Sequence, residues 1–230
     1  MTPPRILITA GPTHEPIDAV RFVGNRSSGR MGVAIADAAA ARGWDVDLLM
    51  GPAPAAPADA RVRVTRFRTC EDLRRLLREH VVRADVLVMA AAVADYRPKI
   101  DPQFFGGKFR RKSETLVLEL EPTPDLLAEV ARVRTPSQLF VGFALEPREE
   151  MVAAAKAKME RKGIDMVVAN PLETMDSDAI EATVLYRDGA PTRSAAKTSK
   201  IEAAAWLVDL IDAAWRTKAP ASAAATGASA

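Results

Sequence analysis

Residues 6–50, ILITAGPTHEPIDAVRFVGNRSSGRMGVAIADAAAARGWDVDLLM, decide the fold, because they predict a strand, a helix and a second strand in succession. ILITA (6–10) is a short β-rich run closed by a Gly-Pro pair, which predicts a buried strand. Residues 29–42 carry apolar side chains at intervals of three and four and stop at Gly43, as a helix does. VDLLM (46–50) predicts the second strand. A crossover helix between two strands predicts that they pair in parallel.

The same alternation continues along the chain. Further strands are predicted at 62–67, 86–91, 139–144 and 165–170, and further helices at 71–82, 124–133, 149–162 and 198–216. This order predicts an α/β fold of the Rossmann-like, doubly wound kind, with a mostly parallel sheet.

Two stretches interrupt the alternation. Residues 104–121 lack a helical period, and LVLELE (116–121) alternates, which predicts an inserted antiparallel β flap. Asp188-Gly189 predicts a hairpin over residues 182–196. We therefore expect one domain over residues 1–216, followed by a disordered Ala/Ser-rich tail at 217–230.

Composition restricts the kind of protein. The net charge is +2, from 32 Lys and Arg against 30 Asp and Glu, which gives no global reason to expect a nucleic-acid partner. A single cysteine, Cys70, excludes a disulfide framework and fits a reducing cytoplasm, and with only two histidines it argues against a Cys/His zinc site. No apolar run approaches the ~18 residues of a membrane span, and the N-terminal one is too short for a signal peptide. We expect a cytoplasmic protein with no membrane contact.

Small polar residues stand directly before the first predicted helix: Asn25, Ser27, Ser28 and Gly29. One interpretation is that Ser27 or Ser28 caps the helix. The other is that an anion binds there, because the first N–H groups of a helix are unsatisfied and carry partial positive charge. The two are compatible, and local chemistry slightly favours the cap. The patterns G-x-G-x-x-G and G-x-x-x-x-G-K-[ST] are absent, which argues against a nicotinamide dinucleotide site and a P-loop.

Three loops with polar content follow predicted strands: AGPTHEPID (10–18), AAAVADYRP (90–98) and GFALE (142–146). Ligands of doubly wound sheets bind beyond the carboxyl ends of the strands. Asp95 could hold a ribose or Mg²⁺ or be a turn residue, and Phe143 could stack on a ligand or lie in the core. The sequence also has two groups of cationic side chains. Such groups ordinarily lie on a solvated surface, but together with a helix N-terminus they could bind a triphosphate. They are Lys108, Arg110, Arg111 and Lys112 on the flap, and Lys156, Lys158, Arg161 and Lys162 on a helix.

Six longer motifs occur in a definite order and spacing over about residues 5–212. They are ITAGPTHEPIDAVRFVGNRSSGRMG (8–32), AAAVADYRP (90–98), K-x-R-R (108–111), PTPDLL (122–127), GFALE (142–146) and AKMERKGIDMVVAN (157–170). In these motifs the chain resembles the phosphopantothenoylcysteine synthetase family, the phosphopantothenate–cysteine ligases of coenzyme A biosynthesis. Members are often fused behind a flavin-dependent decarboxylase.

The resemblance implies a ligation in two steps. The carboxylate of 4′-phosphopantothenate attacks the α-phosphate of CTP, which gives an acyl-cytidylate and pyrophosphate. The amine of L-cysteine then attacks the mixed anhydride and releases CMP. Dividing the reaction in this way activates a carboxylate that amines do not attack directly. Mg²⁺ accompanies the nucleotide, and no flavin is expected.

The resemblance also implies roles for individual residues. Asn25 would hold the activated carbonyl during cysteine attack, and Lys108 would neutralise the nucleotide phosphates. The nucleotide site would be formed by Met89, Ala90, Ala91, Asp95, Lys108, Pro124, Asp125, Leu126, Leu127, Phe143, Lys158 and Lys162, with Asp95 serving the nucleotide end or the metal. Phosphate or substrate would contact Gly11, Ser27, Ser28, Gly29, Arg110 and Arg111.

The chain departs from the family pattern at three places. K-x-R-R replaces the usual Lys-x-Lys-Lys, Thr123 stands where Asn often precedes Pro-Asp, and GFALEPREEM is one residue longer than in some members. Lys108 is kept, so its role is retained, although an arginine is a planar fork and not a point charge. The placement of Lys158 and Lys162 assumes that the extra residue precedes their helix.

Several expectations about partners and alternatives remain. The chain begins at the first strand of this domain, so the decarboxylase step is not expected of it, and a separate flavoprotein decarboxylase could be its partner. Family members form dimers, so a homodimer is expected. Two other functions stay open: a non-catalytic Rossmann-like nucleotide-binding module, and a flavin-dependent phosphopantothenoylcysteine decarboxylase. The residues do not distinguish CTP from ATP.

Overall fold

The computed structural model describes residues 3–99, 107–108, 115–174, 177, 179–187, 189, 192–193 and 198–225. Its strands are β1 (Arg5–Ala10), β2 (His14–Pro16), β3 (Phe22–Gly24), β4 (Asp45–Met50), β5 (Arg63–Arg66), β6 (Val86–Met89), β7 (Tyr96–Pro98), β8 (Leu120–Pro122), β9 (Leu139–Glu146), β10 (Met166–Pro171), β11 (Ala179–Ile180), β12 (Thr183–Tyr186), β13 (Thr192–Arg193) and β14 (Thr198–Ser199). Its helices are α1 (Arg30–Ala41), α2 (Cys70–His80), α3 (Leu126–Ala131), α4 (Met151–Lys162) and α5 (Lys200–Ala225), with short 3-10 helices at Val81–Arg83 and Leu172–Thr174.

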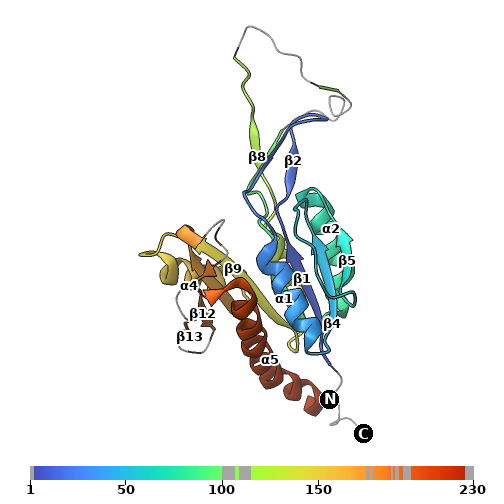
Figure 1. Cartoon of the computed structure of the whole chain (residues 1–230), viewed down its shortest axis with the longest axis vertical. Coiled ribbons are helices and arrows are strands. Elements are labelled where there is room, and N and C mark those ends of the chain that lie inside the picture. The colour runs from blue at the N-terminus through green and yellow to red at the C-terminus, as the bar shows by residue number, and fades with distance from the viewer. Residues whose placement is uncertain are drawn as a thin grey trace.

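The main sheet has the strand order β13-β12-β10-β9-β6-β1-β4-β5 (Figure 1). The strands from β10 to β5 are parallel, and β12 and β13 add an antiparallel hairpin at one edge. The predicted α/β, doubly wound, mostly parallel fold is therefore confirmed. The chain order runs outward from β1 in both directions, so the sheet has its switch point between β1 and β6. Ligands of such sheets bind at the carboxyl ends of the strands beside this point.

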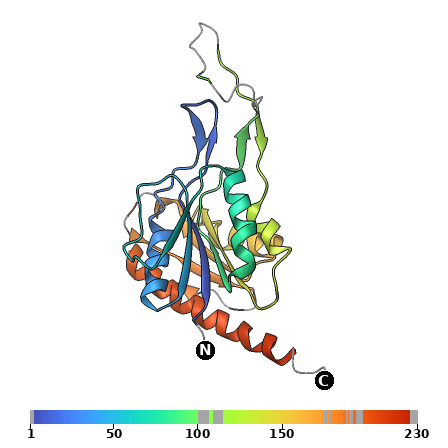
Figure 2. The same ribbon diagram turned by 90° about the vertical axis from the view of Figure 1, so that its right-hand side faces the viewer.

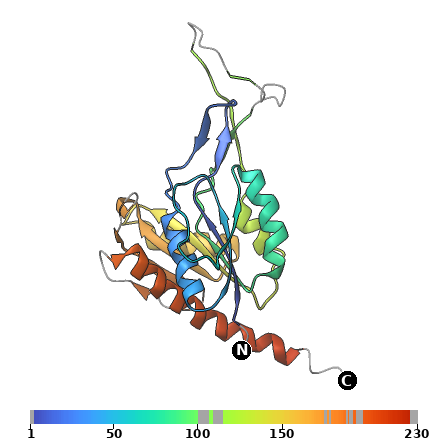
Figure 3. The ribbon, with the colours of Figure 1, turned by 45° about the vertical axis from the view of Figure 1, so that its right-hand side comes forward.

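Helices cover both faces of the sheet and create two cores. Ile6 and Ile8 of β1 lie in the core beneath α1 and α5, whereas Leu7 lies in the core beneath α2, α3 and α4. This alternation follows from the two-residue period of a strand. Figure 3 shows α1 and α5 together on one side of the sheet and α2 on the other.

Helix α1 lies unusually close to β1 because Gly32 has no side chain. A Cβ atom at Gly32 would stand 2.5 Å from the Cβ of Ala10 and 3.1 Å from the carbonyl oxygen of Thr9. Neither neighbour is the end of a flexible side chain, so an added methyl group would push the helix away from the strand. This close approach brings the first turn of α1 to the carboxyl end of β1.

We predict that Gly32→Ala lowers the free energy of unfolding by about 3 kcal/mol, as overpacking in a rigid core does. Gly163→Ala is a matched control. Gly163 has a left-handed φ of 66°, but no heavy atom lies within 4 Å of its added Cβ, so only backbone strain of about 1 kcal/mol is expected. Urea unfolding measures both. A loss at Gly32 no larger than at Gly163 would contradict the close-packing argument.

Two antiparallel hairpins extend beyond the carboxyl edge of the sheet. One pairs β2 with β3 and the other pairs β7 with β8, and they project from the end of the molecule opposite the two termini (Figures 1 and 2). The second hairpin is the root of the predicted flap, although its regular strand, Leu120–Pro122, includes only the last two residues of the alternating stretch 116–121. Arg110 and Arg111 of the flap lie outside the described residues.

Helix α5 is longer than the sequence predicts. It continues to Ala225, through part of the segment predicted to be a disordered tail, and residues 226–230 lie outside the described part of the chain. Lys218 of α5 donates to the carboxylate of Asp165 at 2.7 Å and to the carbonyl oxygen of Gln138 at 3.0 Å. These contacts hold α5 on the amino-terminal edge of the sheet. The Ala/Ser-rich sequence of this segment does not predict them. None of the helices among the described residues has the length and apolar character of a membrane span.

Candidate active site

Two adjoining cavities lie at the carboxyl edge of the sheet. The first, the α4 cavity, has a volume of about 480 Å³ and is bounded by α4 and by the start of α3. The second, the α1 cavity, has a volume of about 730 Å³ and is bounded by the start of α1 and by the segment after β3. The two share one wall, formed by Ala91, Val93, Asp95, Phe143, Glu146 and Lys158.

The α4 cavity gathers most of the residues predicted for the nucleotide. Its lining includes Met89, Ala91, Asp95, Pro124, Asp125, Leu126, Leu127, Phe143, Lys158 and Lys162. Ala90 lies in the lining of the α1 cavity instead. The site prediction did not include Thr123, Glu146 and Arg161, which also line the α4 cavity. Arg161 belonged to the cation group noticed in the sequence, and Glu146 ends the GFALE motif (142–146), from which only Phe143 was selected.

Two lysines on successive turns of α4 are fixed by hydrogen bonds within the α4 cavity. Lys158 Nζ donates to the carbonyl oxygen of Phe143 at 2.6 Å, and Lys162 Nζ donates to the carboxylate of Asp125 at 2.8 Å. Burial lowers the pKa of Lys158, and the neighbouring charge of Lys162 lowers it further. Burial would raise the pKa of Asp125, but hydrogen bonds from Lys162 and from the Ala128 N–H hold it below its ordinary value. The two ammonium groups are therefore fixed in advance, one against a carbonyl oxygen and the other against a carboxylate.

We predict a pH signature for Lys158. Between its lowered pKa and the ordinary value of about 10.4, the unfolded chain binds more protons at this lysine than the folded chain does. The free energy of unfolding therefore contains a term that rises with pH across this window and that Lys158→Met removes. Subtracting the urea-unfolding free energy of the variant from that of the wild type, at pH values up to 10, measures it. A difference that falls as pH rises would contradict the lowered pKa.

The start of α1 differs from the sequence interpretation. Its N-cap is Gly29, which has a φ of 72° and supplies no side-chain cap. The Ser27 hydroxyl lies 3.4 Å from the Gly29 nitrogen, outside the helix, so the expectation that Ser27 or Ser28 caps α1 is wrong. The left-handed turn at Gly29 carries both serines away from the first N–H groups of the helix. Those groups belong to residues that line the α1 cavity, together with Ser27, Ser28 and Gly29 themselves. Gly11 lies behind Gly29 and lines neither cavity.

Asn25 is held at the shared wall by the main chain. It follows β3 and lines the α1 cavity. Its Nδ2 donates to the carbonyl oxygen of Val93 at 3.0 Å. An amide nitrogen has two hydrogens, so this bond orients the group and leaves its second hydrogen for a ligand.

Among the described residues, Lys108 and Gly11 are the two predicted site residues that line neither cavity. Lys108 is exposed on the flap. The carbonyl oxygen of the preceding Gly107 accepts from the Ala19 N–H at 3.2 Å, so this part of the flap contacts the turn between β2 and β3.

Carboxylates in the α4 cavity offer oxygen ligands to a divalent cation. Asp95, Asp125 and Glu146 line the cavity, but no group of three metal-ligating side chains is assembled among the described residues. Mg²⁺ commonly binds through one or two carboxylates together with substrate phosphates and waters. The residues present therefore fit an ion that arrives with a nucleotide.

Comparisons with known proteins identify the family of the chain, and the relatives carry more than one name. The family described as "DNA/pantothenate metabolism flavoprotein C-terminal domain" matches residues 1–214. The coenzyme A biosynthesis bifunctional protein CoaBC of Mycobacterium tuberculosis is 40% identical over 220 residues, which cover 90% of this chain and 51% of that protein. A cysteine/cysteine sulfinic acid decarboxylase from an unknown prokaryotic organism is 43% identical over 169 residues, which cover 74% of this chain and 46% of that protein. The chain thus spans about half the length of these curated relatives.

A solved structure has the same fold. The crystal structure of the C-terminal domain of a coenzyme A biosynthesis bifunctional protein CoaBC superposes with a TM-score of 0.78 and 34% sequence identity. The superposition covers 93% of this chain and 96% of that one.

Proposed function

The chain belongs to the DNA/pantothenate metabolism flavoprotein C-terminal domain family, and on this premise we propose that it ligates 4′-phosphopantothenate to L-cysteine through an acyl-cytidylate. The observation that carries the proposal is the pair of adjoining cavities with a shared wall. A two-step ligase must bind a nucleotide and an acid in separate places, with the reacting carboxylate and the α-phosphate brought together at one point. A simple binding module needs only one of the two.

The α4 cavity would hold the nucleotide. Lys158, Arg161 and Lys162 are arranged there to neutralise its phosphates, and preorganised cations stabilise the charge that develops during transfer. Mg²⁺ bound through Asp95 would supply further charge neutralisation on the phosphates. The main chain at Ala91 and Val93 lies at the shared wall, where its N–H and C=O groups could bind the nucleotide base without help from side chains.

The α1 cavity would hold the acid. The first turn of α1, whose N-cap is a glycine with no side chain, gives the cavity a partial positive charge that suits the substrate phosphate. At the shared wall the carboxylate oxygen would attack the α-phosphorus, and the bond to pyrophosphate would break. The cysteine nitrogen would then attack the acyl carbon, the bond to CMP would break, and Asn25 would donate to the oxygen on which negative charge develops.

The decisive experiment measures pyrophosphate release from CTP with 4′-phosphopantothenate, first without and then with L-cysteine. We expect pyrophosphate in both cases and ligated product with CMP only in the second. ATP, GTP and UTP tested in parallel would establish the nucleotide preference. Failure to release pyrophosphate from any nucleotide in the presence of both substrates would refute the ligase proposal.

A flavin-dependent decarboxylase is the second candidate, because one relative is named as a decarboxylase. The purified chain should distinguish the two directly. A flavin absorption band together with loss of CO₂ from 4′-phosphopantothenoylcysteine would support the decarboxylase. A colourless protein that forms 4′-phosphopantothenoylcysteine would support the ligase.

We also propose that the chain forms a homodimer through the β2–β3 and β7–β8 hairpins. Both carry exposed apolar side chains: Phe22 is 45% exposed, Tyr96 55% and Leu120 44%. Exposed apolar groups gathered on projecting hairpins commonly mark an interface. Analytical ultracentrifugation should give twice the chain mass, and a Phe22→Asp, Leu120→Asp double variant should shift the protein toward the monomer.

A further inference from the structure

The segment Ala90–Asp95, which we call the partition segment, separates the two cavities. Ala91, Val93 and Asp95 line both of them, and Ala90 and Ala92 line the α1 cavity. Ala94 is the one residue of the segment that lines neither, and it is 4% exposed. The first half of the segment is bonded to β1 and to the residue after it, through the N–H groups of Ala90, Ala91 and Ala92. The second half is anchored at Ala94.

Two threonine hydroxyls hold the main chain of Ala94. Thr13 Oγ1 accepts from the Ala94 N–H at 3.0 Å, and Thr123 Oγ1 donates to the Ala94 carbonyl oxygen at 2.6 Å. Each threonine also bonds the segment through its own nitrogen. The Thr13 N–H donates to the Ala92 carbonyl oxygen at 3.2 Å, and the Thr123 N–H donates to that of Asp95 at 2.9 Å.

The composition of the segment explains why outside hydroxyls are needed. Four of its six residues are alanines, which have no polar group with which to fix a loop. A loop that presents its main chain to a ligand must be held before the ligand arrives, because ordering it during binding costs conformational entropy. The threonines come from opposite sides, Thr13 from the loop after β1 and Thr123 from the residue after β8.

We propose that Thr13 and Thr123 are positioning residues for both steps of the ligation. The Ala91 N–H is held separately, by Thr9 Oγ1 at 3.1 Å. By fixing Ala94, Thr13 and Thr123 place the main chain of Val93 at the nucleotide and keep the Val93 carbonyl oxygen where Asn25 binds it. Neither threonine acts on a reacting atom. Thr123 also lines the α4 cavity and directly follows β8, so it joins the end of the β7–β8 hairpin to the partition segment. This inference rests on the proposed ligase function.

The test compares Thr123→Val and Thr13→Val with Thr123→Ser and Thr13→Ser. Valine keeps the shape and removes the hydroxyl, whereas serine keeps the hydroxyl. With CTP as the probe, calorimetry should show a dissociation constant about tenfold higher in each valine variant, the value of one hydrogen bond. In the pyrophosphate assay the KM for CTP should rise by a similar factor, and both serine variants should recover most of it.

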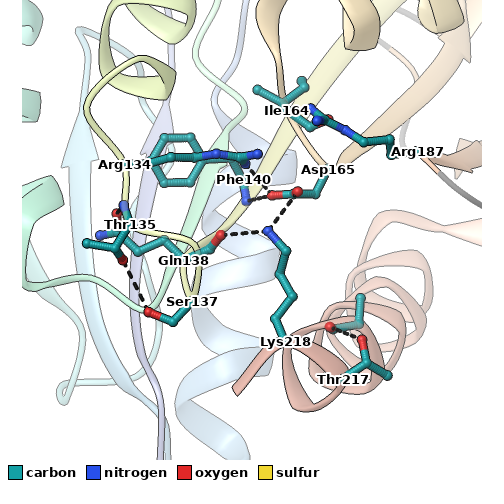
Figure 4. A network of polar contacts seen from close by, with 11 residues as sticks. Arg134, Thr135, Ser137, Gln138, Phe140, Ile164, Asp165, Arg187, Thr217 and Lys218 are labelled. Atoms are coloured by element: carbon teal, nitrogen blue, oxygen red, sulfur yellow. Dashed lines mark hydrogen bonds and ion pairs between the residues drawn. The ribbon is translucent and has the colours of Figure 1, made fainter. Parts of the chain in front are cut away.

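A second measurement does not depend on catalysis. Amide exchange at Ala94, followed by NMR, should be at least about tenfold faster in Thr13→Val, because the N–H loses its acceptor. Thr135→Val is the matched control. Thr135 has a hydroxyl bonded to Ser137 at 3.1 Å, on the loop before β9 at the opposite edge of the sheet, and it should change neither CTP binding nor exchange at Ala94 (Figure 4).

The outcomes separate this inference from the proposed function. Absence of ligation by the wild-type protein would refute the proposed function. The amide exchange at Ala94 would then still show whether Thr13 holds the partition segment. Wild-type KM for CTP and wild-type exchange in the valine variants of an active enzyme would overturn the positioning role. If Thr13→Val does not fold, Thr123→Val decides the question, because the Thr123 hydroxyl is only partly buried. A Thr123→Val enzyme with lowered thermal stability but an unchanged KM for CTP, measured well below its melting temperature, would show a purely structural role.

Discussion

An Asn25→Asp variant is expected to release pyrophosphate at close to the wild-type rate. It should form ligated product about 10²–10³-fold more slowly, which is the effect of removing one hydrogen-bond donor to an oxyanion. The wild-type Nδ2 donates to the Val93 carbonyl oxygen and offers its second hydrogen to the acyl oxygen. A carboxylate has no hydrogen to donate, and it would repel both oxygens. Formation of the acyl-cytidylate draws instead on the cations of the α4 cavity, so the first step should survive.

Quenched-flow analysis of CTP consumption and product formation measures the two steps separately. Asn25→Ala is the control, because it removes the donor without adding a charge. It should show the same separation, with the acyl-cytidylate accumulating until it is slowly hydrolysed. If both variants lose the two steps together, Asn25 shapes the whole site and does not serve cysteine attack in particular.

An Asp165→Ala variant is expected to lose about 3–5 kcal/mol of unfolding free energy, the range found when one partner of a buried ion pair is removed. The Asp165 side chain is 12% exposed and accepts from the Arg134 guanidinium, from the Phe140 N–H at 2.8 Å and from Lys218 Nζ at 2.7 Å (Figure 4). Removing it leaves two cations and one N–H without their common acceptor. It also leaves Lys218 of α5 with only the carbonyl oxygen of Gln138 as its acceptor at the amino-terminal edge of the sheet.

Urea unfolding of wild type and variant gives this loss. Glu79→Ala is the control, because Glu79 pairs with Arg75 on the exposed face of α2 and both side chains are more than half exposed. Its loss should stay below about 0.5 kcal/mol. Asp165 lies at the edge of the sheet opposite both cavities, so Asp165→Ala should retain the wild-type kcat at temperatures where it is folded. A stability change no larger than that of Glu79→Ala would show that the network contributes little.

The strands and helices could be predicted from the sequence because their signals are local. Apolar runs closed by Gly and Pro indicated β1 and β4, and a three- and four-residue apolar period ending in glycine indicated α1 and α4. The boundaries differ from those predicted by a few residues in most elements. The largest difference in a boundary is at α5, whose final turns contain alanine, serine and proline and are helical nonetheless. The short strands β2, β3 and β7, which lie outside the main sheet, were not predicted.

The nucleotide residues could be predicted as a group for a related reason. Parallel strands end at one edge of the sheet, so loops that follow them in the sequence meet in space. The resemblance to a family then selected residues within those loops, and most of them line the α4 cavity. Lys108 lies apart from this group, on the flap.

The sequence by itself determined the order of strands and helices, the edge of the sheet where the loops gather and the chemical types available there. Only the tertiary structure decided which groups touch. The capping serine was a sound local expectation, but the left-handed turn at Gly29 removes it. The hold of Thr13 on Ala94 joins residues 81 positions apart, and the tie from Lys218 to Asp165 joins residues 53 apart. Hydrogen bonds are short and directional, so contacts of this kind depend on how whole elements pack and leave no period in the chain.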